Sequence, residues 1–157
     1  MSLGEVRHHA GMPIHELPAE GTTLAHEVVR ELRPHVGDPE AFATLVNDRL
    51  RPCGYRLVAS FDDDGTVAAA MGLRRAHSLA WGDHLYVDDL VTLPAYRGRG
   101  HARALLDWAR AEAERLGCEQ LHLDSAPHRH DAHRLYLGWG MHISSLHFAV
   151  PVGASGA

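Results

Sequence analysis

The sequence predicts a single α/β domain in which helices and strands alternate around one sheet. The length of 157 residues fits one compact domain, and contents of 45% hydrophobic and 22% charged residues are typical of a globular protein. Residues 54–73 have the pattern of two strands joined by an acidic turn. Residues 85–116 have the pattern of a strand, a glycine-containing turn and a helix. We therefore expect a single domain over residues 1–157.

The strand, turn and helix of residues 85–116 give the strongest local signal. Apolar and β-branched residues dominate 85–93, and Pro94 ends the strand because it lacks a backbone N–H. From Ala102 onward, apolar residues recur at helical spacing and form one face. The turn at 97–102 reads Arg-Gly-Arg-Gly-His-Ala. Glycines let a ligand approach the backbone, and the amides of a helix start attract anions, so this turn predicts an anion site.

Caps, breakers and periodicity predict the remaining elements. Thr22 and Thr23 are candidate caps for one helix, and Asp38 for the next. The acidic turn at 62–65 is interpreted as a solvated hairpin turn. The predicted strands are 5–9, 54–61, 66–73, 120–124 and 142–150, and the further predicted helices are 22–34, 38–50 and 131–139.

Composition excludes several classes of function. The formal net charge of -5 argues against a nucleic-acid backbone as the partner, and no apolar run approaches the ~20 residues of a membrane span. The N-terminal stretch lacks the apolar core of a signal peptide, so a cytoplasmic protein is expected. Cys53 and Cys118 are expected to be free thiols. The spacing of His128, His130 and His133 matches no metal-ligand pattern, so no metal is expected.

The order of elements and two motifs resemble the GNAT acyltransferase family. Arg97, Gly100 and Ala102 stand at the three specified positions of the family's diphosphate motif for acyl-CoA, Gln/Arg-x-x-Gly-x-Gly/Ala. Ala132 and Tyr136 are similar to the alanine and tyrosine of its Asn-x-x-Ala-x-x-x-Tyr segment. The resemblance extends over most of the chain. It implies the GNAT fold, an α/β (α+β) arrangement with a mixed central sheet of about six to seven strands flanked by helices.

The resemblance implies acetyl-CoA as co-substrate, without a metal, and a primary amine of a small molecule or peptide as acceptor. Arg129 stands where many members carry Asn, so the contact of that Asn side chain with the pantetheine arm does not transfer unchanged to this chain. Arg129 is expected to pair instead with a phosphate or with Asp131. The implied cofactor contacts lie on the strand, on the turn and before the last helix. They are Leu90, Val91, Thr92, Arg97, Gly98, Arg99, Gly100, His101, Ala102, Arg103 and Arg129.

Three residues are candidates for the chemistry. Asp88 and Asp89 are adjacent carboxylates in an apolar strand, and only one is expected to point into a given cleft because successive strand residues face opposite sides. Asp88 resembles the general base of several GNAT members and acts directly or through a water. Asp89 is then a contact for the substrate ammonium or a structural acceptor. Tyr136 resembles the tyrosine that protonates the departing thiolate, a sensible role for a hydroxyl of pKa about 10.

Several alternatives stay open at this level. A non-catalytic sensor or interaction module with the same acyl-CoA site is the competing functional class. A nucleotide-binding P-loop is disfavoured, because His101 and Ala102 stand where that motif needs Lys and Ser/Thr. Polyamines, aminoglycosides and lysine-bearing peptides suit the acceptor side equally, and that side is expected in the loops 8–23 and 77–83. A homodimer is also open.

Overall fold

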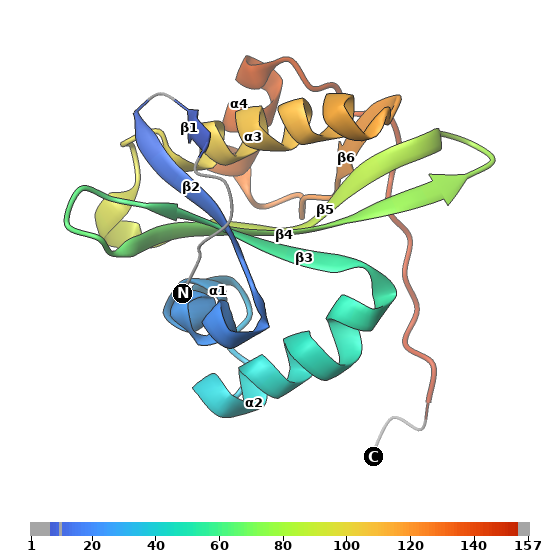
Figure 1. Cartoon of the computed structure of the whole chain (residues 1–157). Helices are drawn as coiled ribbons and strands as arrows, with labels where there is room; N and C mark the ends of the chain where they lie inside the picture. The colour runs from blue at the N-terminus through green and yellow to red at the C-terminus, as the bar shows by residue number, and fades with distance from the viewer. Residues whose placement is uncertain (1–6, 10, 154–157) are drawn as a thin grey trace. The chain divides into compact units, whose positions relative to one another are not determined.

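The computed structural model describes residues 7–9 and 11–153, and Figure 1 shows the course of the chain. The described residues fall into two compact units, one reaching Leu123 and one beginning at Asp124. Within the described ranges, no helix combines the length and the apolar character that crossing a membrane requires.

The first unit is built on a six-stranded sheet with the strand order β1-β2-β3-β4-β5-β6. All neighbouring strands are antiparallel except β5 and β6, which are parallel. The sheet is therefore mixed, and the expected mixed sheet of about six to seven strands is confirmed. The strands are β1 (Arg7–His9), β2 (Met12–Leu17), β3 (Tyr55–Phe61), β4 (Val67–Ser78), β5 (Gly82–Thr92) and β6 (Gln120–Leu123).

Helices cover both faces of this sheet. Helices α1 (His26–Leu32) and α2 (Pro39–Thr44) lie on one face, and α3 (His101–Leu116) lies on the other (Figure 1). Val28, Phe42 and Leu57 belong to the apolar core on the α1 side, whereas α3 buries Leu105 and Leu106. The burial of these side chains holds the layers together. Irregular helical turns complete the unit at Ala19–Ala25, Leu45–Leu50, Arg51–Cys53 and Pro94–Tyr96.

The N-terminal half departs from the sequence-based expectation in three places. The helix predicted at 22–34 begins as a 3-10 helix, and Thr22 is buried and donates to Asn47 Oδ1 (2.8 Å) instead of capping a helix. Strand β2 was expected to be a loop, because Gly11 and Pro13 are typical breakers. Pro13 is tolerated at its register position opposite His8 of the short edge strand β1. Residues 5 and 6 of the predicted first strand lie outside the described residues.

Other local predictions are confirmed. Asp38 caps α2, because its carboxylate accepts from the backbone N–H of Ala41 (2.8 Å). Helix α3 begins one residue before Ala102 and ends at Gly117, which adopts a φ of 72°. Strand β4 is longer than predicted, since it continues through polar residues to Ser78, where pairing with β5 supports it.

The second unit contains α4 (His130–Trp139), which ends at Gly140 with a φ of 106°. The strand predicted at 142–150 is wrong, because this segment has no regular secondary structure. Ile143, Leu146 and Phe148 are exposed there. Two serines at 144–145 interrupt the apolar alternation, and a strand also needs a partner to form its ladder.

Candidate active site

Strand β5 contains a β-bulge at Asp88. Gly72 of β4 pairs with Asp89, whereas the next residue, Leu73, pairs with Val87. Asp88 is therefore an extra residue without a register partner on β4. Bulges bend a strand and redirect its side chains, and they often occur beside active sites.

The bulge brings both carboxylates to one face of the sheet. Tyr55 pairs with Arg74 across β3 and β4, so their side chains share a face. Asp88 Oδ2 accepts from Arg74 Nε (3.0 Å), and Asp89 Oδ2 accepts from Tyr55 Oη (2.9 Å). The expectation that Asp88 and Asp89 face opposite sides is wrong, because it assumed unbroken alternation along the strand.

A second arginine reaches these carboxylates from the end of α1. Arg33 Nε donates to Asp89 Oδ1 (2.8 Å), and its Nη2 donates to the backbone oxygen of Asp88 (3.3 Å). Asp88, Asp89, Arg33 and Arg74 form the group that we call the charged quartet. The two arginine side chains are 45% and 42% exposed, so the quartet is accessible to a ligand.

The environment gives the two carboxylates different properties. Burial raises the pKa of Asp88 above its ordinary value, and the Arg74 guanidinium opposes this rise only in part. Burial and the neighbouring Asp89 carboxylate also raise the pKa of the Tyr55 hydroxyl, which therefore stays a proton donor. Both oxygens of Asp89 are engaged by Tyr55 and Arg33. This geometry favours the structural alternative for Asp89. Both oxygens of Asp88 accept from the partly exposed Arg74 side chain, and the pKa of Asp88 is raised.

Past the bulge, β5 extends beyond the end of β6. The parallel ladder joins residues 84–87 of β5 to Gln120–Leu123 and ends at the pair Val87 and Leu123. Leu90, Val91 and Thr92 continue the strand and pair with β4. Their backbone thus lies past the end of the neighbouring strand, as the resemblance to a pantetheine-binding segment requires.

The glycine turn follows directly and has an open backbone. Gly98 and Gly100 adopt φ values of 77° and 96°, a conformation that favours glycine. Gly100 is the N-cap residue of α3 and brings no side chain to cap it, and the backbone N–H of Ala104 is bonded to its oxygen (2.9 Å). Among the described residues other than its two chain neighbours, none has an atom within 4 Å of where a Cβ on Gly98 would stand. The first amides of α3 can therefore meet an anion.

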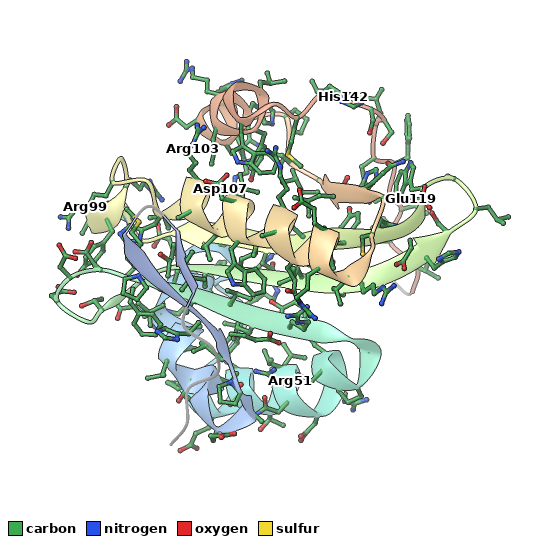
Figure 2. All side chains as sticks on the ribbon, turned by 45° about the horizontal axis from the view of Figure 1, so that its top comes forward. Arg51, Arg99, Arg103, Asp107, Glu119 and His142 are labelled. Carbon is green, nitrogen blue, oxygen red and sulfur yellow. The ribbon has the colours of Figure 1, made fainter. Side chains whose placement is uncertain are left out.

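The side chains of the turn have different surroundings. Arg97 is 61% exposed and pairs with Glu31 of α1 (3.6 Å). Arg99 pairs with Asp62 (2.8 Å), and Arg103 is exposed on the first turn of α3 (Figure 2). His101 is buried instead, so only its backbone amide is suited to contact a ligand.

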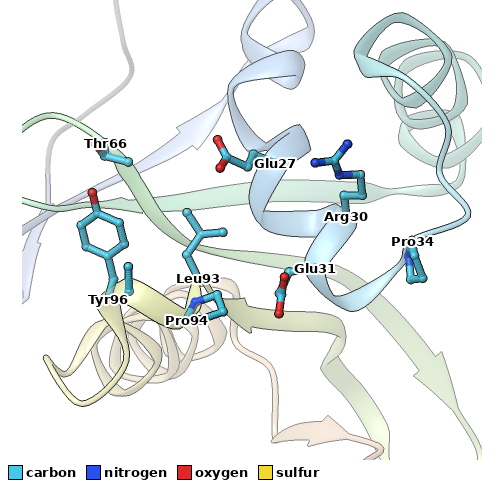
Figure 3. Close-up of a pocket in the computed structure, with 9 residues that line it drawn as sticks. Glu27, Arg30, Glu31, Pro34, Thr66, Leu93, Pro94 and Tyr96 are labelled. Carbon is cyan, nitrogen blue, oxygen red and sulfur yellow. The ribbon is translucent and has the colours of Figure 1, made fainter.

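A cavity of about 550 Å³ lies between α1 and the segment that leads into the turn (Figure 3). Glu27, Arg30 and Glu31 of α1 line it, together with Thr66 and residues such as Leu93 and Tyr96. None of the predicted site residues lines this cavity. Sequence reasoning missed the contribution of α1, because only its apolar face was informative.

Tyr136 and Arg129 belong to the second unit. Arg129 is the N-cap residue of α4, and Tyr136 lies within that helix. Burial raises the pKa of the Tyr136 hydroxyl, and Arg129 opposes the rise. The hydroxyl is therefore protonated at neutral pH. Asp131 pairs with Arg134 (2.6 Å), so the alternative in which Arg129 pairs with Asp131 is not the arrangement found.

The histidines near α4 do not form a metal site. The rings of His130 and His133 meet edge to face with centroids 6.2 Å apart. Across the part of the chain that the structure describes, no three or more His, Cys, Asp or Glu side chains are grouped so that they could hold a metal ion.

Residues 21–140 match the family model described as the acetyltransferase (GNAT) family. The chain belongs to the GNAT family. An uncharacterised N-acetyltransferase YhdJ of Bacillus subtilis is 32% identical over 82% of this chain and 89% of its own. The aminoalkylphosphonate N-acetyltransferase of Salmonella typhimurium is 31% identical over 87% of this chain and 91% of its own. With this family and these relatives, the protein is an acyltransferase.

Solved structures confirm the GNAT fold. The aminoglycoside N-acetyltransferase AAC(6')-Iy in complex with CoA aligns with a TM-score of 0.79 at 14% identity, over 96% of this chain and all of its own. The same enzyme with a bisubstrate analogue of CoA aligns with a TM-score of 0.78 at 15% identity, over 91% of this chain and 99% of its own. At this identity the likeness establishes the fold alone.

Gly72→Ala tests the packing beneath the bulge. A Cβ on Gly72 would stand 1.8 Å from Tyr55 Oη, so the ring must move and its hydrogen bond to Asp89 breaks. We expect the free energy of unfolding to fall by about 2–4 kcal/mol, measured with urea. Gly138→Ala in α4 is the control and should be neutral or slightly stabilising, because beyond the adjacent helix backbone a Cβ there would meet no atom of the described residues within 4 Å.

A double-mutant cycle isolates the cause. In a Tyr55→Ala background the clash is absent, so adding Gly72→Ala should cost much less than it does in the wild type. An equal cost in both backgrounds would show that the tyrosine does not dictate glycine at position 72.

Proposed function

We propose that this GNAT protein is an acetyl-CoA-dependent N-acetyltransferase that transfers the acetyl group directly to a primary amine. The observation that carries the proposal is the placement of a raised-pKa carboxylate, Asp88, at a bulge in the strand that leads into the glycine turn. A base and an anion-binding turn at the two ends of one strand segment fit a thioester donor and an amine acceptor.

Asp88 is the proposed general base. Direct transfer requires an uncharged amine, so the acceptor ammonium must lose a proton before it attacks the thioester carbon. A carboxylate with a raised pKa removes this proton more readily than an ordinary aspartate. Asp88 acts directly or through one water, and Asp89 supports it by fixing Tyr55 and Arg33 beside the bulge.

The proposed cofactor site runs along β5 into the turn. The backbone of residues 90–92 would accompany the pantetheine arm, and one of its amides is a candidate to polarise the thioester carbonyl. The diphosphate would bind the amides of residues 98–103, with Arg97, Arg99 and Arg103 supplying positive charge. Arg129 is a further candidate contact for phosphate. The CoA-bound neighbours with this fold support the assignment.

Tyr136 is the proposed general acid. When the tetrahedral intermediate collapses, the C–S bond breaks and the CoA thiolate takes a proton. A half-buried tyrosine that stays protonated at neutral pH is a suitable donor. The acceptor ammonium loses two protons in one turnover: Asp88 takes the first before attack, and the second leaves the nitrogen as the intermediate collapses. One of them replaces, through solvent, the proton that Tyr136 gives to the thiolate, and the other is released to solvent.

The charged quartet favours a zwitterionic acceptor. Its two carboxylates and two guanidiniums balance, so a ligand with one ammonium and one anionic group adds no net charge to the site. The ammonium would replace Arg74 at Asp88, and the released guanidinium would take the anion. A polyamine would instead meet two arginines. The relative that acts on aminoalkylphosphonates supports this acceptor class.

Asp88→Asn tests the base. We expect kcat/KM to fall by about 10²-fold or more, because the amide cannot take the proton. In the wild type, kcat/KM should rise with pH through the raised pKa of Asp88, and this limb should vanish in the variant. Rates of CoA release from about pH 4, near the ordinary pKa of aspartate, to about pH 9 measure both effects. Asp48→Asn, an exposed change, is the control, and an unchanged pH profile in D88N would rule out the base role.

Tyr136→Phe tests the acid. Turnover should fall by at least about tenfold while the Kd for acetyl-CoA changes little, because the hydroxyl acts on the departing thiolate. An acetyl thioester of a more acidic thiol needs less protonation, so it should restore much of the lost rate. If turnover is unchanged in Y136F, or if the thioester of the more acidic thiol does not restore the lost rate, Tyr136 is not the acid.

An amine panel tests the acceptor class. Thiol release should be at least about tenfold more efficient with an aminoalkylphosphonate or an amino acid than with a diamine of similar length. Arg74→Gln should remove this preference, while Arg49→Gln, an exposed control, should keep it. A preference for the diamine contradicts the zwitterion proposal. Binding of acetyl-CoA without thiol release from any amine would instead favour the non-catalytic sensor.

A further inference from the structure

The acidic hairpin between β3 and β4 contacts the glycine turn, a role beyond that of a solvated turn. Asp62 Oδ2 accepts from Arg99 Nη1 (2.8 Å), and Asp62 Oδ1 lies 3.1 Å from His101 Nε2. One carboxylate thus engages the second arginine of the turn and the first residue of α3. Asp62 is 37 positions from Arg99 and 39 positions from His101 in sequence, so both contacts are tertiary.

The imidazole of His101 is held at both ring nitrogens. Its side chain is fully buried, and Nδ1 lies 2.9 Å from Ser60 Oγ on β3. An ionised Asp62 only accepts, so Nε2 carries a proton and donates to it. In the neutral ring, Nδ1 then accepts from the Ser60 hydroxyl. A buried ring with both nitrogens satisfied has one orientation, so the start of α3 is fixed to β3.

A second contact from the same hairpin supports the first. Tyr96 Oη donates to Asp64 Oδ2 (3.0 Å), and the Tyr96 ring meets the His101 ring edge-on with centroids 6.3 Å apart. The guanidinium of Arg99 lies over the Tyr96 ring at 4.9 Å. The residues on both sides of the glycine turn are therefore tied to the hairpin.

We propose that Asp62 is a positioning residue for the cofactor diphosphate. Asp62, His101 and Ser60 form what we call the hairpin clamp. By fixing the first residue of α3 and the guanidinium of Arg99, the clamp orders the backbone amides of the turn before the cofactor arrives. Because these groups are already ordered, binding of the cofactor does not have to reduce their conformational entropy. This inference rests on the proposed binding of CoA at the turn.

The negative charge of Asp62 does not make it a competitor of the phosphate. Asp62 engages Nη1 of Arg99, and a guanidinium has five N–H donors, so the same group can bridge the carboxylate and a phosphate oxygen. The Arg99 side chain is 52% exposed, whereas Asp62 is 18% exposed. The more exposed guanidinium is paired with the carboxylate and offsets its negative charge toward an incoming anion.

Two acetyl donors separate this role from general stability. Acetyl-CoA carries the diphosphate, and acetyl-pantetheine lacks it. Asp62→Asn should lower kcat/KM for acetyl-CoA by about tenfold, through KM and with little change in kcat. The loss with acetyl-pantetheine should be much smaller. Asp63→Asn, an exposed change in the same hairpin, should leave kcat/KM for both donors unchanged.

Three results of this experiment would overturn the clamp: equal losses with both donors, no loss with acetyl-CoA, or a lower KM for acetyl-CoA in D62N. Should D62N fail to fold, Ser60→Ala removes only the bond to Nδ1 and should show the same donor-dependent loss, smaller in size. The wild-type protein distinguishes failure of the clamp from failure of the proposed cofactor site. If it does not favour acetyl-CoA over acetyl-pantetheine, the proposed cofactor site fails as well, whereas a wild-type preference that D62N retains refutes the clamp alone.

Discussion

The one-residue bulge at Asp88 is the constraint on which the arrangement of this site depends. It interrupts the alternation of β5, so that Asp88 and Asp89 reach the same face of the sheet. On the opposite strand, Gly72 leaves room for the Tyr55 ring, which occupies the space that a side chain there would need and donates to Asp89. Without the extra residue, one carboxylate would face α1 and the other α3. The positions of the side chains in the charged quartet are thus set first by the backbone register of β5 against β4.

The proposed division of labour follows from the course of β5. The bulge offers a basic carboxylate, the segment past β6 offers backbone, and the glycine turn offers amides and arginines. Because the strand is held by β4 along this length, the distance between the base and the turn is fixed by the sheet. The hairpin clamp extends this logic, since β3 supplies Ser60 and the hairpin supplies Asp62 to hold the turn itself.

Local signals in the sequence predicted most of the fold and the turn. Gly98, Gly100 and the apolar spacing of α3 act within a few residues, and so does the cap at Asp38. The bulge could not be predicted, because it depends on the register of β5 against β4. A single glycine in β4, Gly72, does not by itself indicate a bulge in the neighbouring strand. Arg33 joins Asp89 across 56 positions, and Asp62 joins His101 across 39, so neither contact has a local signature. The strand expected at 142–150 was inferred from composition alone.

A crystal structure with CoA and an aminoalkylphosphonate bound would show whether donor and acceptor meet along β5. We expect the diphosphate at the amides of residues 98–103, pantetheine beside residues 90–92, and the acceptor nitrogen at the Asp88 carboxylate, directly or through one water. The phosphonate should contact Arg74. Density that places the diphosphate away from the turn, or the acceptor amine away from Asp88, would refute the proposed site.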